Sequence, residues 1–213
     1  MNFVFLLALL SFRTDTFTHF TYCHEMSRGL YESQCVELDP TGKGLVQFKR
    51  RGGADAVKLG VTLSSVAREK FLSIIEGTNN LDQPETFESS RKVADLGRKH
   101  VSIELTSGAK REGEFNYSLR KDINDLMNFC EGVINEEMIG FDIDNAIQYD
   151  RLSIPKKIDM MENELKNNRI ADPERLIPIL DKIQNDQRLI NYARARAGKM
   201  KEQILAKKRG TTG

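Results

Sequence analysis

Apolar and polar positions alternate through residues 30–117 and predict a sheet. The clearest strand spans residues 57–63, where every second residue is apolar. Residues 30–38 and 45–50 flank a cluster of turn residues and predict a hairpin. A second strand pair lies on either side of Ser107-Gly108, over residues 101–105 and 115–117. Connections of hairpin length favour a mainly antiparallel sheet of about five strands.

Helical spacing of apolar residues interrupts this strand pattern. Ser64 or Ser65 supplies an N-cap for a helix that ends at Gly77. Residues 81–97 show neither spacing and predict a long loop before the second strand pair.

From Ser118 onward, helical spacing replaces the strand pattern. We expect Gly132 and Gly140 to interrupt the first of these helices. Pro155 sits where a first helical residue would, and Asp172-Pro173 combines an N-cap with a first-turn proline. A last helix is predicted from five apolar residues at helical spacing: Leu189, Ala193, Ala197, Met200 and Ile204.

The order of these elements predicts an α+β protein. We expect the sheet, with helices on one face, in residues 29–150 and an all-helical C-terminal extension in residues 151–209. Residues 1–28 are assigned to a leader or to a mis-assigned start. The chain has 213 residues, of which 39% are hydrophobic, so it can bury a sizeable core.

The leader assignment depends on an apolar run at residues 3–10. The run has the length of a signal-peptide core and is too short to span a bilayer as a helix. No lysine or arginine precedes it, and no small-residue cleavage site follows. Met26 offers an alternative start, which would give a cytoplasmic protein. The pattern favours an exported or periplasmic protein without a transmembrane segment.

Three cysteines leave the redox state open. Cys23 falls in the assigned leader, so a mature chain would keep Cys35 and Cys130. That pair permits one disulfide in an oxidising compartment, and it equally permits two buried thiols.

Charge is distributed unevenly along a chain whose formal net charge is only +1. Residues 122–150 carry eight acidic residues and no lysine or arginine, whereas residues 188–209 carry eight basic residues and one glutamate. We expect these two helical segments to face and partly neutralise each other.

The residue types argue against most catalytic designs. Only three histidines occur, and His19 and His24 lie in the assigned leader, which leaves His100. No Gly-x-Ser-x-Gly elbow accompanies it. The sequence therefore predicts no catalytic residue, no metal ligand and no cofactor.

Two surfaces carry candidate binding residues. On the outward face of the second strand pair, a three-residue loop at residues 107–109 sets Glu104 opposite Glu112 and His100 opposite Asn116. Like charges directly opposite each other destabilise a strand pair, so either the register is shifted by two residues, or the face is solvated, or a cation or basic partner lies between the carboxylates. The last helix offers a basic face for phosphates, formed by Arg194, Lys199 and Lys201. Open-sheet RNA binders stack bases on exposed aromatic residues, which are missing from these outward strand positions.

These observations favour a non-catalytic binding or protein-interaction module, exported or envelope-associated, with a protein partner. Two alternatives stay open. One is a nucleic-acid-associated protein that uses the basic helix, and the other is a carboxylate-dependent enzyme on the sheet face.

Overall fold

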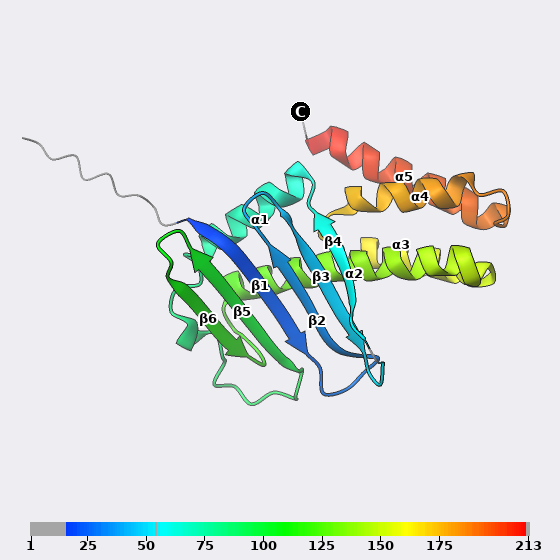
Figure 1. The fold of residues 1–213 in the computed structure, drawn as a ribbon. Coiled ribbons are helices and arrows are strands. Elements are labelled where there is room, and N and C mark those ends of the chain that lie inside the picture. The colour runs from blue at the N-terminus through cyan, green and yellow to red at the C-terminus, as the bar shows by residue number, and fades with distance from the viewer. Residues whose placement is uncertain (1–15, 54, 212–213) are drawn as a thin grey trace, which may run out of the picture.

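The computed structural model describes residues 16–53 and 55–211 and has an α+β fold (Figure 1). A six-stranded antiparallel sheet has the order β4-β3-β2-β1-β5-β6. Its strands are β1 (Phe17–Glu25), β2 (Tyr31–Leu38), β3 (Lys43–Arg50), β4 (Val57–Thr62), β5 (Arg98–Leu105) and β6 (Lys110–Phe115). The helices are α1 (Ser65–Gly77), α2 (Lys121–Tyr149), α3 (Ile154–Lys166), α4 (Ile177–Asn185) and α5 (Asn191–Thr211), with short 3-10 turns η1 (Pro84–Thr86), η2 (Arg151–Ser153) and η3 (Pro173–Leu176).

The predicted fold class is confirmed. In Figure 1, α1 and α2 lie behind one face of the sheet, and no helix of the described chain covers the face toward the viewer. The remaining helices extend beyond the β4 edge as a separate layer.

The sixth strand corrects the assignment of residues 1–28 to a leader. Within that segment, Phe17–Glu25 form β1, which pairs with β2 on one side and β5 on the other. Phe20 and Tyr22 are fully buried beneath the helices. The apolar run that suggested an export signal, residues 3–10, lies outside the described residues.

The hairpin between β5 and β6 turns one residue earlier than predicted. Leu105 N donates to Ala109 O, so Thr106, Ser107 and Gly108 form the loop. Gly108 has a φ of 84°, the left-handed conformation that ends three-residue hairpin loops. The earlier turn shifts the pairing of the two strands by two residues.

The first hydrophobic core, called here the sheet core, fills the space between the sheet and its two helices. Its buried residues run from Phe17 to Ile134. The long loop predicted at residues 81–97 is present and contributes to this core, because Phe87 is fully buried. A Cβ atom on Gly113 would lie 2.5 Å from the Phe87 ring, so β6 needs a glycine where the loop crosses it.

The second hydrophobic core, called here the helical core, lies between α3, α4, α5 and the end of α2 and runs from Ile143 to Ile204. α2 therefore belongs to both cores. The predicted interruptions at Gly132 and Gly140 are wrong, because α2 is one continuous helix of 29 residues. Gly132 serves close packing instead, since a Cβ atom there would lie 2.9 Å from Ala171 N.

The two oppositely charged segments do not pair in the way the sequence suggested. On α5, Arg196 pairs with Asp159 and Glu162 of α3, and Lys201 pairs with Asp181 of α4. The acidic residues of α2 have other partners. Asp142 pairs with Arg50 and Lys157, Asp144 with Lys182, and Glu136 and Glu137 with Arg175. The acidic residues of α2 thus find their countercharges on β3, η3, α3 and α4, and the basic residues of α5 find theirs on α3 and α4.

Candidate ligand site at the junction of the two cores

A chain of hydrogen bonds joins α1, α2 and η3 where the two cores meet. Ser64 caps α1 and donates to Asp172 from its backbone N (2.6 Å) and its hydroxyl (2.8 Å). Asp172 N in turn donates to Glu136 Oε2 at 2.9 Å. The helical turn predicted at Asp172-Pro173 is present, but the Asp172 side chain bonds Ser64 instead of capping that turn. These hydrogen bonds hold the start of η3 against the N-terminus of α1 and against α2.

Glu136 is a buried carboxylate with one unsatisfied oxygen. Its side chain is 1% exposed, and Oε1 accepts no hydrogen bond from the described residues. Arg175 Nε lies 3.3 Å from this oxygen but donates to Glu137 Oε1 at 3.0 Å instead. Burial raises the pKa of Glu136 well above its usual range. A buried oxygen without a donor is costly, so a group that supplied one would gain affinity.

Arg175 links the same site to the edge of the sheet. Its guanidinium donates to Glu137 and to the carbonyl oxygen of Thr62, the last residue of β4. β4 is an edge strand, so this contact satisfies a carbonyl that has no strand partner. Burial raises the pKa of Glu137, although Arg175 opposes the effect.

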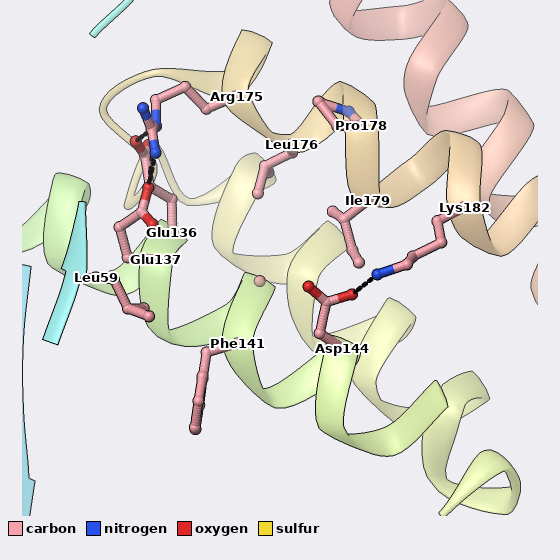
Figure 2. A pocket seen from close by; sticks show the side chains of 11 residues that line it. Leu59, Glu136, Glu137, Phe141, Asp144, Arg175, Leu176, Pro178, Ile179 and Lys182 are labelled. Atoms are coloured by element: carbon pink, nitrogen blue, oxygen red, sulfur yellow. Dashed lines mark hydrogen bonds and ion pairs between the residues drawn. The ribbon is translucent and has the colours of Figure 1, made fainter. Parts of the chain in front are cut away.

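These side chains line a cavity of about 440 Å³ between α2 and α4. Figure 2 shows Arg175 above Glu136 and Glu137 at one end, and the ion pair of Asp144 with Lys182 at the other. Leu59 of β4, Phe141 of α2 and Ile179 of α4 form apolar parts of the wall. We call this space the junction cavity. Its volume is in the range of small-ligand sites, about 300–1,000 Å³.

The acidic side chains of the junction cavity outnumber its basic ones. Three carboxylates, those of Glu136, Glu137 and Asp144, face two cations, Arg175 and Lys182. Glu136 is the most buried of the three, and it shares Arg175 with Glu137 instead of having a cation of its own. A ligand with one positive group on an apolar stem would match both features of the cavity.

The polar sheet face predicted from His100, Glu104 and Glu112 exists, but its geometry differs. Glu104 lies opposite Lys110, and Ser102 lies opposite Glu112, so the pairing of Glu104 with Glu112 is wrong and the alternative register, shifted by two residues, is the one present. Lys110 Nζ is 2.8 Å from Glu112 Oε2, and His100 Nε2 is 3.9 Å from the same oxygen. The hydrogen bond from Lys110 lowers the pKa of Glu112. The cation sought between two carboxylates is therefore a lysine of the chain itself.

The predicted basic face of the last helix is partly occupied by internal contacts. Arg194 donates to the carbonyl oxygen of Gln184, and Lys201 pairs with Asp181, both on α4. Lys199 is exposed. Of the three side chains, Lys199 is therefore the one that is exposed to solvent.

Sequence reasoning missed a polar cluster on the opposite flank of α2. Tyr22 donates to Glu131 Oε1 at 2.9 Å, and His24 Nδ1 lies 3.4 Å from the same atom. Burial opposes ionisation, yet hydrogen bonds from His24 and Tyr22 lower the pKa of Glu131. Glu131 and His24 border an open cleft of about 790 Å³. The alternation of Phe20, Tyr22 and His24 was the available signal, because it places all three on one strand face.

The cysteines pair differently from the two alternatives considered. Cys23 and Cys35 lie opposite each other on β1 and β2 and form a disulfide, whereas Cys130 is free and buried. Burial raises the pKa of the Cys130 thiol. The disulfide lies on the open face of the sheet, away from the sheet core.

The comparisons with known proteins give no relative. No family model matches the chain, and no curated protein is significantly similar to it. Within residues 16–53 and 55–211, no helix has the length and apolar character needed for a bilayer span. The same residues contain no group of three or more His, Cys, Asp or Glu side chains placed to hold a metal ion.

Proposed function

We propose that the protein is a non-catalytic binding module whose ligand site is the junction cavity. The ligand carries a single cationic group, such as an ammonium or guanidinium, on an apolar stem. A basic side chain of a partner protein has this chemistry, as do small organic amines. The proposal depends above all on Glu136 Oε1, a buried carboxylate oxygen that accepts no hydrogen bond from the described residues.

The lining of the cavity supports binding rather than catalysis. Its polar groups are carboxylates, one arginine and one lysine, most of them engaged in ion pairs with each other. No histidine, cysteine, serine or threonine lines it, and the lining carboxylates and lysine that could act as nucleophiles take part in ion pairs. The two alternative functions have less support. Two of the three basic side chains proposed to bind nucleic acid, Arg194 and Lys201, contact α4 instead. On the sheet face proposed for a carboxylate-dependent enzyme, Lys110 is paired with Glu112.

The disulfide supports placing the protein in an oxidising compartment. Structural disulfides persist in secreted and periplasmic proteins and are rare in the reducing cytosol. Cys23 and Cys35 are half-buried on the open sheet face, so cytosolic reductants could reach them. We therefore propose export. A chain starting at Met26 would lack β1, so we place the start of translation upstream of Phe17.

Three probes of similar shape and different charge test the site. These are n-butylamine, n-butanol and butyrate, each titrated into the full chain and followed by ligand-observed NMR. We expect binding in the order amine, alcohol, acid, with millimolar affinity for the amine because the probe is small. Affinity for the amine should rise with pH, since burial raises the pKa of Glu136 and binding requires its charged form.

Glu136→Gln is the deciding variant. It keeps the shape of the side chain and removes the charge, so amine binding should fall about tenfold or more. Glu104→Gln, on the open sheet face, is the matched control and should bind like wild type. Equal binding of amine and alcohol, or unchanged amine binding by a folded Glu136→Gln protein, would contradict the proposal.

A further inference from the structure

β4 has one unpaired edge, on the side of the helical extension. It pairs with β3 alone and ends the sheet there (Figure 1). Leu63 N donates to Gly42 O just beyond the strand, and hydrogen-bonded pairs alternate along antiparallel strands. The backbone N–H and C=O groups of Lys58, Gly60 and Thr62 therefore point away from β3. This edge of the sheet is open to a further strand.

The free edge already attracts a donor at one end. The Arg175 guanidinium donates to the carbonyl oxygen of Thr62, where a strand partner would place an N–H group. Within residues 16–53 and 55–211, no hydrogen bond reaches the outward groups of Lys58 or Gly60. Each of these two residues thus offers one donor and one acceptor to an extended segment.

Gly60 is suited to a close approach by another backbone. Its φ is not positive, and a Cβ atom there would meet nothing within 4 Å. Neither conformation nor packing within the described chain therefore requires glycine at this position. Glycine inside a strand weakens it and often marks a place where a ligand or another backbone comes near.

The opposite edge of the sheet is protected against strand addition. Leu105 N donates to Ala109 O, so the backbone groups of Lys110, Glu112 and Glu114 point outward from β6. All three carry charged side chains, which natural sheets use to prevent pairing at an edge. On β4, one of the three outward residues is charged. The two edges therefore differ, and β4 is the one that accepts a strand.

An added strand would send alternate side chains into the junction cavity. Leu59 points from β4 to the helix side of the sheet and lines this cavity (Figure 2). A residue opposite Leu59 across the free edge forms a non-hydrogen-bonded pair, in which the two side chains lie close together on one face. Its side chain therefore enters the space lined by Glu136 and Glu137. The excess of acidic groups there favours a lysine or an arginine at this position.

We propose that the partner is an extended segment of another protein, which adds a seventh strand to β4 and inserts one lysine or arginine into the junction cavity. This inference rests on the proposed function, because it requires the cavity to be a cation site. The backbone of the segment bonds Lys58 and Gly60, and its basic side chain donates to Glu136 Oε1. Main-chain hydrogen bonds supply affinity in such strand addition, and the side-chain pocket supplies specificity.

Three blocked seven-residue peptides test the edge separately from the cavity. The first alternates threonine and valine around a central lysine. The second has norleucine in place of the lysine, and the third keeps the lysine but carries N-methyl groups on the two threonines that flank it. Each is titrated into the full chain and followed by NMR, with n-butylamine as the reference.

The lysine peptide should bind about tenfold or more tightly than n-butylamine, because backbone hydrogen bonds add to the ion pair. The norleucine peptide loses the ion pair and the N-methylated peptide loses the backbone bonds, so each should bind about tenfold or more weakly than the lysine peptide. Amide hydrogen exchange of Lys58 and Gly60 should slow when the lysine peptide is bound and stay unchanged with n-butylamine.

Gly60→Pro is the deciding variant. The Gly60 nitrogen faces away from β3, so proline removes an outward donor without removing a hydrogen bond of the sheet. Affinity for the lysine peptide should fall about tenfold or more, whereas n-butylamine should bind as it does to wild type. Glu112→Pro, at an outward position of β6, is the matched control and should leave both affinities unchanged.

The outcomes separate this proposal from the cation site itself. If n-butylamine binds and the lysine peptide binds no more tightly, the edge proposal is wrong and the cavity proposal stands. If neither binds, both are wrong. A wild-type dimer that Gly60→Pro dissociates, measured by size-exclusion chromatography, would assign the edge to a second copy instead. If Gly60→Pro does not fold, the N-methylated peptide decides, because binding equal to that of the lysine peptide overturns the proposal.

Discussion

The two hydrophobic cores are built from different side chains, although α2 belongs to both. The sheet core contains seven buried phenylalanines. One of them, Phe71, contacts the rings of Phe17, Phe20 and Phe129 at centroid distances of 5.4–5.8 Å. The buried members of the helical core are aliphatic residues, alanines and methionines. Rings bring together strands and helices from distant parts of the sequence, while Ala193 and Ala197 let neighbouring helices approach closely. The sheet core thus depends on ring contacts between elements far apart in the chain, and the helical core on aliphatic packing between successive helices.

The largest expected effect comes from removing the central ring of the sheet core. Phe71→Ala should lower the free energy of unfolding by about 3–5 kcal/mol, through lost burial and a residual cavity. Urea unfolding followed by circular dichroism measures the change. Hydrogen exchange should show protection lost first in the sheet and α1, with the helical core affected less. Equal loss in both regions would mean that the two cores act as one unit.

The shared helix provides a sharper test of how the cores are coupled. Gly140 lies between the last fully buried α2 residue of the sheet core, Ile134, and the first of the helical core, Ile143. Gly140→Pro removes a helical hydrogen bond and should cost about 3 kcal/mol or more. We expect the unfolding transition to split in two, as α2 then breaks between the cores.

Gly140→Ala is the control for this variant. A Cβ atom at Gly140 meets nothing within 4 Å. Alanine should therefore stabilise the protein by about 0.5–1 kcal/mol, because it restricts the unfolded chain without a clash. A single, unsplit transition in the folded proline variant would show that α2 does not transmit the coupling.

The smallest effect concerns the carboxylate between the cores. Since Glu136 has a raised pKa in the folded state, the folded protein binds more protons than the unfolded chain above about pH 4.5. This group therefore lowers stability as pH rises through that window. Glu136→Gln should match wild type at low pH and become increasingly more stable than wild type as pH rises above about 4.5. Denaturant unfolding across the pH range measures the difference, and a variant less stable at high pH would mean that Arg175 stabilises the charged form.

The sequence predicted the parts of the fold that depend on local pattern. The alternation in residues 57–63 predicted a strand, which is present as β4. The predicted N-cap at Ser64 is present at the start of α1. Gly132 and Gly140 led to a wrong prediction of helix breaks. The low helix propensity of glycine is a smaller effect than the packing of α2 on two cores. β1 was missed because the apolar run before it suggested a leader, although Phe20 and Tyr22 already alternated with polar residues.

The junction site could not be predicted from the sequence. Glu136 and Asp172 are far apart in the chain, and no motif connects them with Ser64. Only the fold brings η3 against the start of α1. The sheet-face prediction failed for a smaller reason, since a turn one residue earlier moved Lys110 into the place expected for Glu112.

The central position of β1 imposes an order on the protein's biogenesis. A ribosome delivers this strand first, and β2 can pair with it at once, but β5 emerges only after some seventy further residues. Until then one side of β1 is an open template for other chains. A bond between Cys23 and Cys35 would hold the nascent hairpin in register while that side waits for its partner.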